Sequence, residues 1–139
     1  MTLSHTKAHI YRALLESVAY SLRHVMESMT DTDILLEKIV LVGGGAKSII
    51  WKQIFADVTG LPIVTPVQEI EAPLGDAFMA AIGSGQIHEY SNIESWIQMN
   101  PAVFPNQKNH EQYEKYFNLY KELYPNLKMS MSKRIDMLK

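Results

Sequence analysis

The fold is decided by the stretch IVLVGGGAKS at residues 39–48. Its four apolar residues are too few for a helix and are rich in β-branched types, so they predict a short, fully buried strand. The three glycines predict a tight turn, and Ser48 is a good N-cap for a helix. Glycine and the N–H groups at a helix start let a flat or phosphorylated ligand approach the main chain. The stretch therefore favours a nucleotide-binding corner, although it is neither G-x-G-x-x-G nor a P-loop.

The residues after this corner predict a βαβ unit. The buried face of the helix is expected to consist of Trp51, Ile54, Phe55 and Val58. Gly60 and Pro62 stop the helix, and residues 63–65 form a second short strand. The short connections make the two strands parallel and the crossover right-handed.

The remaining pattern is mostly helical. It predicts helices at about 4–29, 73–85 and 109–124, a short helix at 92–98 and an extended segment at 101–105. Pro125 is expected to end the last long helix and to leave the tail from residue 128 loosely held. Two short parallel strands cannot form an independent sheet. We therefore expect the chain to be part of something larger or to pair with a second copy of itself.

Composition sets the class of protein. The 139 residues suffice for one domain, and 47% apolar with 20% charged residues is typical of a globular protein. A formal net charge of −2 gives no electrostatic case for nucleic acid or a membrane surface. The chain has no cysteine, no signal segment and no apolar run long enough for a bilayer. We expect a cytoplasmic domain that binds neither nucleic acid nor membrane.

Three blocks of sequence, in this order, resemble the C-terminal portion of the FGGY carbohydrate kinases, the group that contains xylulose, gluconate and glycerol kinases. They are LSHTKAHIYRALLESVAY at residues 3–20, GGGAKS at 43–48 and EAPLGDA at 71–77. The tyrosine-rich helix at 113–124 also matches the end of such proteins. The resemblance covers nearly the whole chain, and the order of the blocks is more specific than any single block.

The resemblance implies an α/β fold, a partial ribonuclease H-like domain of the actin-like ATPase type that is helix-rich with a short parallel sheet. Residues 1–139 would be the incomplete C-terminal, nucleotide-binding portion of the second kinase domain. The family's adenosine-binding motif falls on Gly43, Gly44, Gly45, Ala46, Ser48 and Ile49. Of these, Gly44, Gly45 and Ala46 would line the adenine and α-phosphate side, and Ser48 and Ile49 would lie near the base and ribose.

The expected cofactors are ATP or ADP with Mg²⁺, and the expected substrate is a sugar bound through the missing N-terminal domain. The family's phosphate loops, its catalytic aspartate and the hairpin strands that complete the sheet are absent from this sequence. Phosphoryl transfer needs phosphate clamps, Mg²⁺ and a positioned nucleophile together. We therefore assign no catalytic residue and expect no kinase activity from the chain alone.

Other residues have alternative interpretations. His5 and His9 have a spacing that can bind zinc, but no third ligand is evident, so capping or surface roles are favoured and no metal ligand is assigned. The carboxylates Asp57, Asp76, Glu69 and Glu71 are explained by helix-surface or helix-N-terminal roles. Lys47 could touch a phosphate, and the tyrosine stripe on the last helix is expected to pack rather than to stack on adenine.

Two other functions compete with the kinase segment. The chain could bind nucleotide, or a full-length kinase subunit, without catalysing a reaction. It could instead be a structural remnant whose exposed helix faces drive self-association into a homo-oligomer, covering the first helix and the sheet edge.

Overall fold

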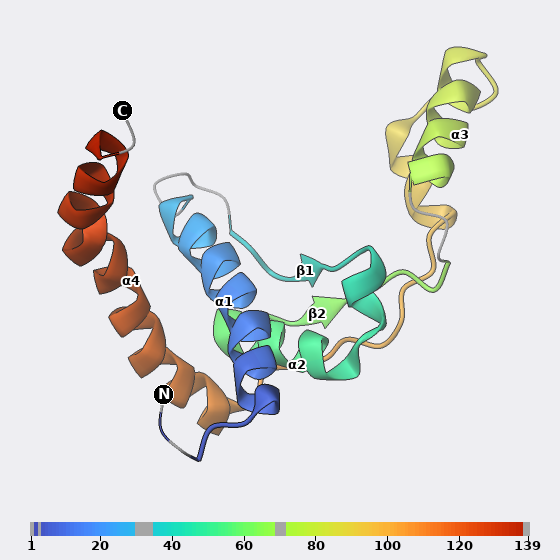
Figure 1. Cartoon of the computed structure of the whole chain (residues 1–139). Coiled ribbons are helices and arrows are strands. Elements are labelled where there is room, and N and C mark those ends of the chain that lie inside the picture. Colours follow the sequence, from blue (N-terminus) through green and yellow to red (C-terminus); the bar gives the residue numbers. More distant parts are fainter. Residues whose placement is uncertain (1, 3, 30–34, 69–71, 138–139) are drawn as a thin grey trace.

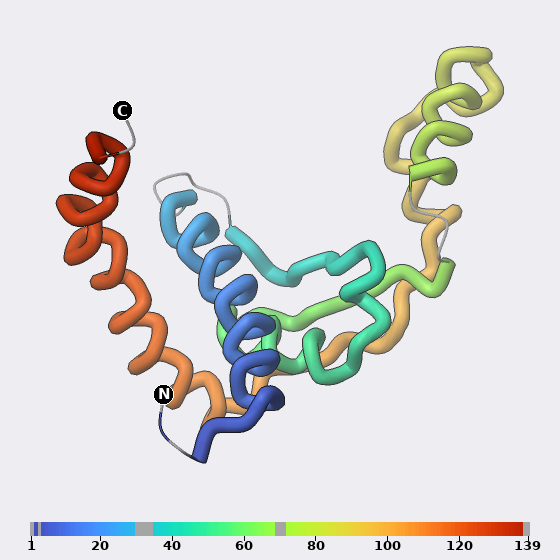
Figure 2. The backbone as a smooth tube through the Cα atoms, in the orientation of Figure 1, coloured from blue at the N-terminus to red at the C-terminus, as the bar shows by residue number. Residues whose placement is uncertain are grey.

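The structure is a computed structural model that describes residues 2, 4–29, 35–68 and 72–137. Its elements, in chain order, are α1 (Lys7–Ser28), β1 (Ile39–Val40), η1 (Gly44–Lys47), α2 (Ile49–Thr59), β2 (Ile63–Val64), α3 (Ala72–Gly83), η2 (Tyr90–Ser95) and α4 (Gln107–Asp136), with η1 and η2 being 3₁₀-helices. Helices α1 and α4 and the unit β1–α2–β2 form the body of the molecule (Figure 1). Helix α3 stands away from that body with η2, as the backbone trace shows (Figure 2).

The two strands are parallel, as the βαβ pattern predicts. Ile39 pairs with Ile63 and Val40 with Val64, and the Ile39 N–H donates to the Pro62 carbonyl over 2.9 Å. On its other side, β2 forms an antiparallel bridge between Ile63 and Val103. The expected extended segment at 101–105 therefore supplies a third line of backbone to the sheet.

The prediction of a fully buried first strand is wrong. The regular strand is only two residues long, and the side chains of Val40 and Val42 are 46% and 54% exposed. The reason is the position of β1 in the sheet order, where β2 is its single neighbour among the described residues. An apolar, β-branched run is typical of a strand buried on both faces, whereas among the described residues this one is an edge strand.

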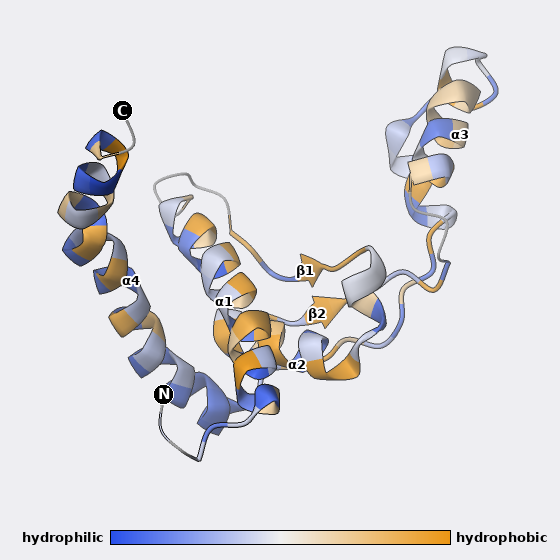
Figure 3. Ribbon diagram, in the orientation of Figure 1, coloured by the Kyte–Doolittle hydropathy of each residue, from blue (hydrophilic) through white to orange (hydrophobic). Residues whose placement is uncertain are grey.

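The core surrounds α2. Its side chains from 54 to 58 are all buried, and they contact α1, α4 and β2. Ala19 and Phe117 are completely buried, and Phe117 stacks on Tyr20 with ring centroids 6.1 Å apart. Arg23 covers the Phe117 ring at 4.3 Å. The hydropathy colouring shows apolar residues gathered at this junction and also at several turns along α1 (Figure 3).

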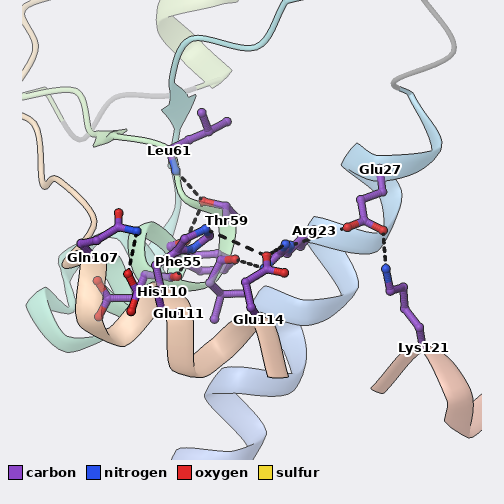
Figure 4. A network of polar contacts seen from close by, with 12 residues as sticks. Arg23, Glu27, Phe55, Thr59, Leu61, Gln107, His110, Glu111, Glu114 and Lys121 are labelled. Carbon is purple, nitrogen blue, oxygen red and sulfur yellow. Dashed lines mark hydrogen bonds and ion pairs between the residues drawn. The ribbon is translucent and has the colours of Figure 1, made fainter. Parts of the chain in front are cut away.

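Polar contacts join α1 to α4 around the same core (Figure 4). Arg23 on α1 bonds Glu114 on α4 and donates to the Val58 carbonyl, and burial lowers the pKa of Arg23. One turn further along α1, Glu27 accepts a hydrogen bond from Lys121 over 3.1 Å. These contacts hold the two long helices side by side.

Asp57 is buried, with 1% exposure, so a helix-surface role is wrong for it. Its carboxylate accepts the Asn106 N–H over 2.8 Å and the Asn109 amide over 2.8 Å, and Asn106 is the N-cap of α4. The expected helix-N-terminal role is therefore present, but it acts on a different helix. Because the carboxylate accepts hydrogen bonds from donors at the start of α4, it fixes α4 to α2.

The last helix departs from the prediction. Helix α4 continues through Pro125 to Asp136, so the proline does not end the helix and the tail is helical. Proline removes one backbone donor and disturbs one turn, but the following residues are mostly good helix formers that restart the pattern. The predicted short helix near 92–98 is the 3₁₀-helix η2. No helix in the described ranges is both long and apolar enough to cross a membrane.

Candidate nucleotide corner

The glycine-rich turn connects β1 to α2 through a short 3₁₀-helix that the sequence did not predict. Gly43 has φ 86°, and η1 follows at Gly44–Lys47. The Ala46 N–H donates to the Gly43 carbonyl over 2.9 Å, and the Ser48 N–H donates to the Gly45 carbonyl over 3.1 Å. These bonds turn the chain through the corner and leave Ser48 in the extended conformation that an N-cap needs.

Ser48 is the N-cap of α2, as predicted. Its hydroxyl accepts the Trp51 N–H over 3.3 Å. The helix ends at Gly60, which has the left-handed φ of 74° typical of a helix C-terminus. Both signals were local, so the bounds of α2 could be predicted closely from the sequence.

The three glycines of the corner have different structural reasons. Gly43 has a positive φ that other residues rarely adopt. A Cβ on Gly45 would lie 2.3 Å from the Trp51 ring, so Gly45 allows the indole to pack against the main chain. Gly44 has neither reason, because a Cβ there would meet no described atom within 4 Å. Of the three glycines of the corner, Gly44 is the one that neither its φ nor the packing of described residues requires.

Trp51 has a larger role than the predicted core position. Its ring packs against Gly45 and lies 5.5 Å from the Phe55 ring, and its indole N–H donates to the Leu15 carbonyl over 3.3 Å. The indole therefore holds the glycine corner against α1. The single indication of this contact in the sequence is an aromatic residue on the first turn of the helix that follows the glycines.

The predicted site residues lie together at one corner of the molecule. Gly43, Gly45 and Ala46 are half-buried, whereas Gly44, Ser48 and Ile49 are exposed. Ile49 is 76% exposed at the first position of α2, and Ile50 beside it is 62% exposed. The corner thus combines exposed backbone, a helix N-terminus and an apolar surface. This arrangement can accept an anion next to an apolar ring.

An apolar groove beside the corner was not foreseen. It has a volume of about 300 Å³ and is lined by Val40, Val42, Pro66, Gln68, Ala72, Leu74, Ile97 and Met99. It lies between the strands and the start of α3. Because these residues come from segments far apart in the chain, no local pattern could have identified the groove.

The competing candidates have structural explanations. The Nδ1 atoms of His5 and His9 accept the backbone N–H groups of Thr2 and Thr6, which is the capping role favoured above. In the part of the chain that the structure describes, no three His, Asp or Glu side chains are grouped as a metal site would need. Asp76 is exposed. Glu69 and Glu71 lie outside the described residues.

The tyrosines of the stripe on α4 differ in how deeply they are buried. Tyr113 is buried against α1, and Tyr120 stacks on Tyr20 with ring centroids 5.6 Å apart, so the expected packing role is confirmed for these two. Tyr116 and Tyr124 remain 51% and 62% exposed.

Known proteins agree with this architecture. The xylulose kinase of Staphylococcus epidermidis is 34% identical over 125 residues, which cover 89% of this chain. Glycerol kinase 2 of Thermotoga maritima is 34% identical over 123 residues. The crystal structure of the ligand-bound xylulose kinase of Lactobacillus acidophilus superposes with a TM-score of 0.85 and 28% identity, covering 96% of this chain. The gluconate kinase of the same organism gives 0.84 and 28% over the same share.

The chain spans about a quarter of these relatives, namely 25% of the two curated kinases and 27% of the two solved structures. The model of the FGGY family of carbohydrate kinases, C-terminal domain, matches residues 1–84. This range contains α1, the strands, the glycine corner and α3. The chain therefore belongs to the FGGY family of carbohydrate kinases and carries the C-terminal domain of that family.

Proposed function

We propose that this chain is the nucleotide-binding C-terminal segment of an ATP-dependent kinase that transfers the γ-phosphate of ATP to a sugar hydroxyl. Several relatives are xylulose kinases and one similar structure is a gluconate kinase, so the proposed sugar is xylulose or a related sugar or sugar acid. The sugar would bind mainly through the three quarters of the relatives' length that this chain does not span. Mg²⁺ would arrive with the nucleotide.

The observation that carries the proposal is Gly44. A glycine has no Cβ, so it lets a ligand approach the main chain closely, and at this turn between a strand and a helix N-terminus Gly44 is exposed with open space where its Cβ would lie. Its exposed position allows the adenine and α-phosphate side of a nucleotide to lie against the main chain. Ala46 would lie on the same side.

The start of α2 supports the same ligand. Exposed Ile49 and Ile50 offer an apolar surface for a base, next to Ser48 at the helix N-terminus. The N–H groups of an 11-residue helix favour a negative charge there. Gly43 and Gly45 would act indirectly, by setting the turn and by seating Trp51.

Catalysis needs more than this corner. A phosphoryl-transfer site clamps the phosphates, holds Mg²⁺ and positions the attacking hydroxyl beside a base. The described acidic side chains near the corner do not form such a set, since Asp57 is engaged in capping α4. We therefore propose that the chain alone does not phosphorylate sugars. Incubation with ATP, Mg²⁺ and xylulose should release no ADP above background, and steady turnover would contradict this view.

A titration of ADP and ATP, with and without Mg²⁺, tests the binding role by calorimetry. Gly44→Val places a branched side chain where the ligand would lie, and open space around the Cβ predicts that the fold is kept. Gly75→Val on α3 is the matched control, since its Cβ also meets no described atom. We expect saturable ADP binding that Gly44→Val weakens at least about tenfold, or 1.4 kcal/mol. Equal binding by wild type and a folded Gly44→Val would refute the assignment.

Self-association is a second candidate, and a specific observation favours it. Large apolar side chains remain exposed along α1, including Tyr11 at 65% and Leu14 at 60%. Contiguous apolar surface of this kind marks an interface. Sedimentation over a range of concentrations separates the candidates: a dimer that ignores ADP supports a structural remnant, and an ADP-binding monomer supports the kinase segment.

A further inference from the structure

Helix α4 extends beyond the helix that packs beside it. Side-chain bonds join α1 to α4 from Tyr113 as far as Lys121, which bonds Glu27 in the last turn of α1. Helix α1 ends at Ser28, whereas α4 continues to Asp136 (Figure 1). Residues 122–137 are all exposed. About 24 Å of helix is therefore uncovered by the rest of the described chain.

One face of α4 carries an apolar row along both its packed and its uncovered part. Its members follow one another at alternating spacings of four and three: Tyr113, Phe117, Tyr120, Tyr124, Leu127 and Met131. We call this row, with Ile135 one turn further on, the α4 seam. The spacing is the heptad pattern by which one helix packs along another. The seam therefore presents one helix-packing surface over the length of α4.

Only the first half of the α4 seam is filled in the described structure. Phe117 is completely buried, and the Tyr20 ring of α1 stacks on Phe117 and on Tyr120. The second half has no such cover. Its exposed fractions are 62% for Tyr124, 49% for Leu127, 53% for Met131 and 59% for Ile135. The packing surface thus continues past the point where α1 ends.

An uncovered helix of this length gains stability from a partner. Helices shorter than about 12–15 residues are marginal in water, because most helical stability in proteins comes from packing an apolar face. Pro125 lies at the start of this part and removes one backbone donor. A second helix laid along the seam would continue the α1–α4 packing without a break.

Arg134 indicates which helix fits. It occupies the seam position three residues after Met131, so any partner helix meets its guanidinium. A guanidinium binds well over an aromatic ring, and in the filled half Arg23 already lies 4.3 Å from the centre of the Phe117 ring. A helix with an aromatic residue at the facing position therefore suits Arg134.

The second half of the α4 seam is itself such a helix when it runs antiparallel. With a two-fold axis at the level of residue 129, Arg134 faces the partner's Tyr124, and Leu127 faces the partner's Met131. A parallel pair would instead set each Arg134 against its own copy. The segment 122–137 carries charges of both signs, so it does not demand a strongly acidic partner.

We propose that the second half of the α4 seam binds a second copy of this chain, so that two α4 helices form an antiparallel pair in a symmetric dimer. Each copy contributes the same surface, as a two-fold interface requires. The seam shares no residue with the glycine corner, so the dimer forms whether or not the chain binds nucleotide.

The first measurement is sedimentation equilibrium of the full chain without nucleotide over a range of concentrations. We expect a reversible equilibrium between monomer and dimer, because the seam is buried in the dimer alone. A monomer at every concentration would overturn the proposal, and the seam would then belong to a contact with another protein or with further chain.

Two methionines provide a matched pair of variants. Met131 lies on the seam, whereas Met129, two residues earlier, points to the opposite side of α4, and both are exposed, at 53% and 72%. Met131→Glu should raise the dimer dissociation constant at least about tenfold, because it buries a charge at the interface. Met129→Glu should leave that constant within about twofold. Equal effects, or a dimer lost instead in Leu14→Glu on the exposed face of α1, would refute the seam.

Engineered cysteines test the direction of the pair, since the chain has no cysteine of its own. A mixture of Leu127→Cys and Met131→Cys should form a disulfide between copies at least about fivefold more than either variant alone. In the antiparallel pair, two copies of residue 127 lie about 6 Å apart along the axis, which disfavours the bond. Equal or stronger cross-linking of each single variant would indicate parallel helices and overturn the proposal.

Lys128 gives the dimer a distinctive charge dependence. It lies at the edge of the seam, one position from the two-fold axis, so the two copies of its ammonium group approach each other. Added salt should therefore tighten the dimer by screening, and Lys128→Gln should tighten it about twofold. Misfolding does not produce tighter association of this kind when circular dichroism shows a native helix content. A dimer weakened by Lys128→Gln would contradict the pairing.

Discussion

The molecule has two unlike regions, the body around α2 and the side formed by β1 and α3. In α2, five consecutive side chains are buried, whereas Phe78 is the one buried side chain of α3 in the described structure. Phe78 contacts Trp96 of its own lobe, with ring centroids 5.4 Å apart, while Met79 next to it is 55% exposed. The comparison teaches that the chain supplies its own packing on the α2 side and leaves the other side for additional protein. A chain that spans a quarter of its relatives is expected to have such an uncovered side.

The largest effect should come from the α2 body. Phe117→Ala removes a completely buried ring that contacts Tyr20, Arg23 and Tyr120. We expect a loss of about 3–5 kcal/mol in the free energy of unfolding, measured by urea denaturation. Phe104→Ala is the control, since Phe104 is 67% exposed and should cost far less. Similar losses for the two phenylalanines would break the distinction between a packed and an unpacked region.

An intermediate effect is expected at the polar contact between α2 and α4. Asp57→Ala leaves the Asn106 N–H and the Asn109 amide without their acceptor at the start of α4. Hydrogen bonds to a charged group contribute about 1.5–3 kcal/mol each, so unfolding should occur at clearly lower urea. Asp76→Ala, at an exposed position of α3, should change the midpoint little. If Asp76→Ala proved as harmful, α3 would be docked in a way that the structure does not show.

The smallest effect concerns alkaline pH. Burial raises the pKa of Tyr20 and of Tyr113 in the folded chain above that of an unfolded tyrosine, about 10. The folded state therefore holds protons that the unfolded state releases, so stability is full below pH 10 and falls as pH rises above it. Urea midpoints at pH 9 and pH 11 should show this fall, and Tyr20→Phe should reduce it. An identical fall in that variant would mean that the buried ring does not contribute.

The sequence predicted well those features that depend on neighbouring residues in the chain. Ser48 caps α2 and Gly60 ends it, because a cap and a left-handed residue depend on two or three adjacent backbone groups. The parallel pairing of β1 and β2 followed from the short connections. The prediction that Pro125 ends the helix is wrong, because the effect of a proline depends on whether the residues after it resume the helix, and here they do.

Spatial relations could not be predicted in the same way. Asp57 on α2 meets the N-terminus of α4, 49 residues further along, and the bond from Arg12 on α1 to Tyr113 on α4 joins residues 101 positions apart. The separate reasons for the three glycines also needed coordinates, because the conflict at Gly45 involves the ring of Trp51 and the open space at Gly44 is a property of its surroundings.

By itself, the sequence determined the order of elements, the parallel strands and the glycine corner, because periodicity, caps and turn residues act over a few positions. The tertiary structure alone decided which strand face stays exposed, which glycine has open space beside it, and that Asp57 meets the start of α4. Those features arise where segments distant in the chain meet, and burial there depends on what each segment packs against rather than on its own residues.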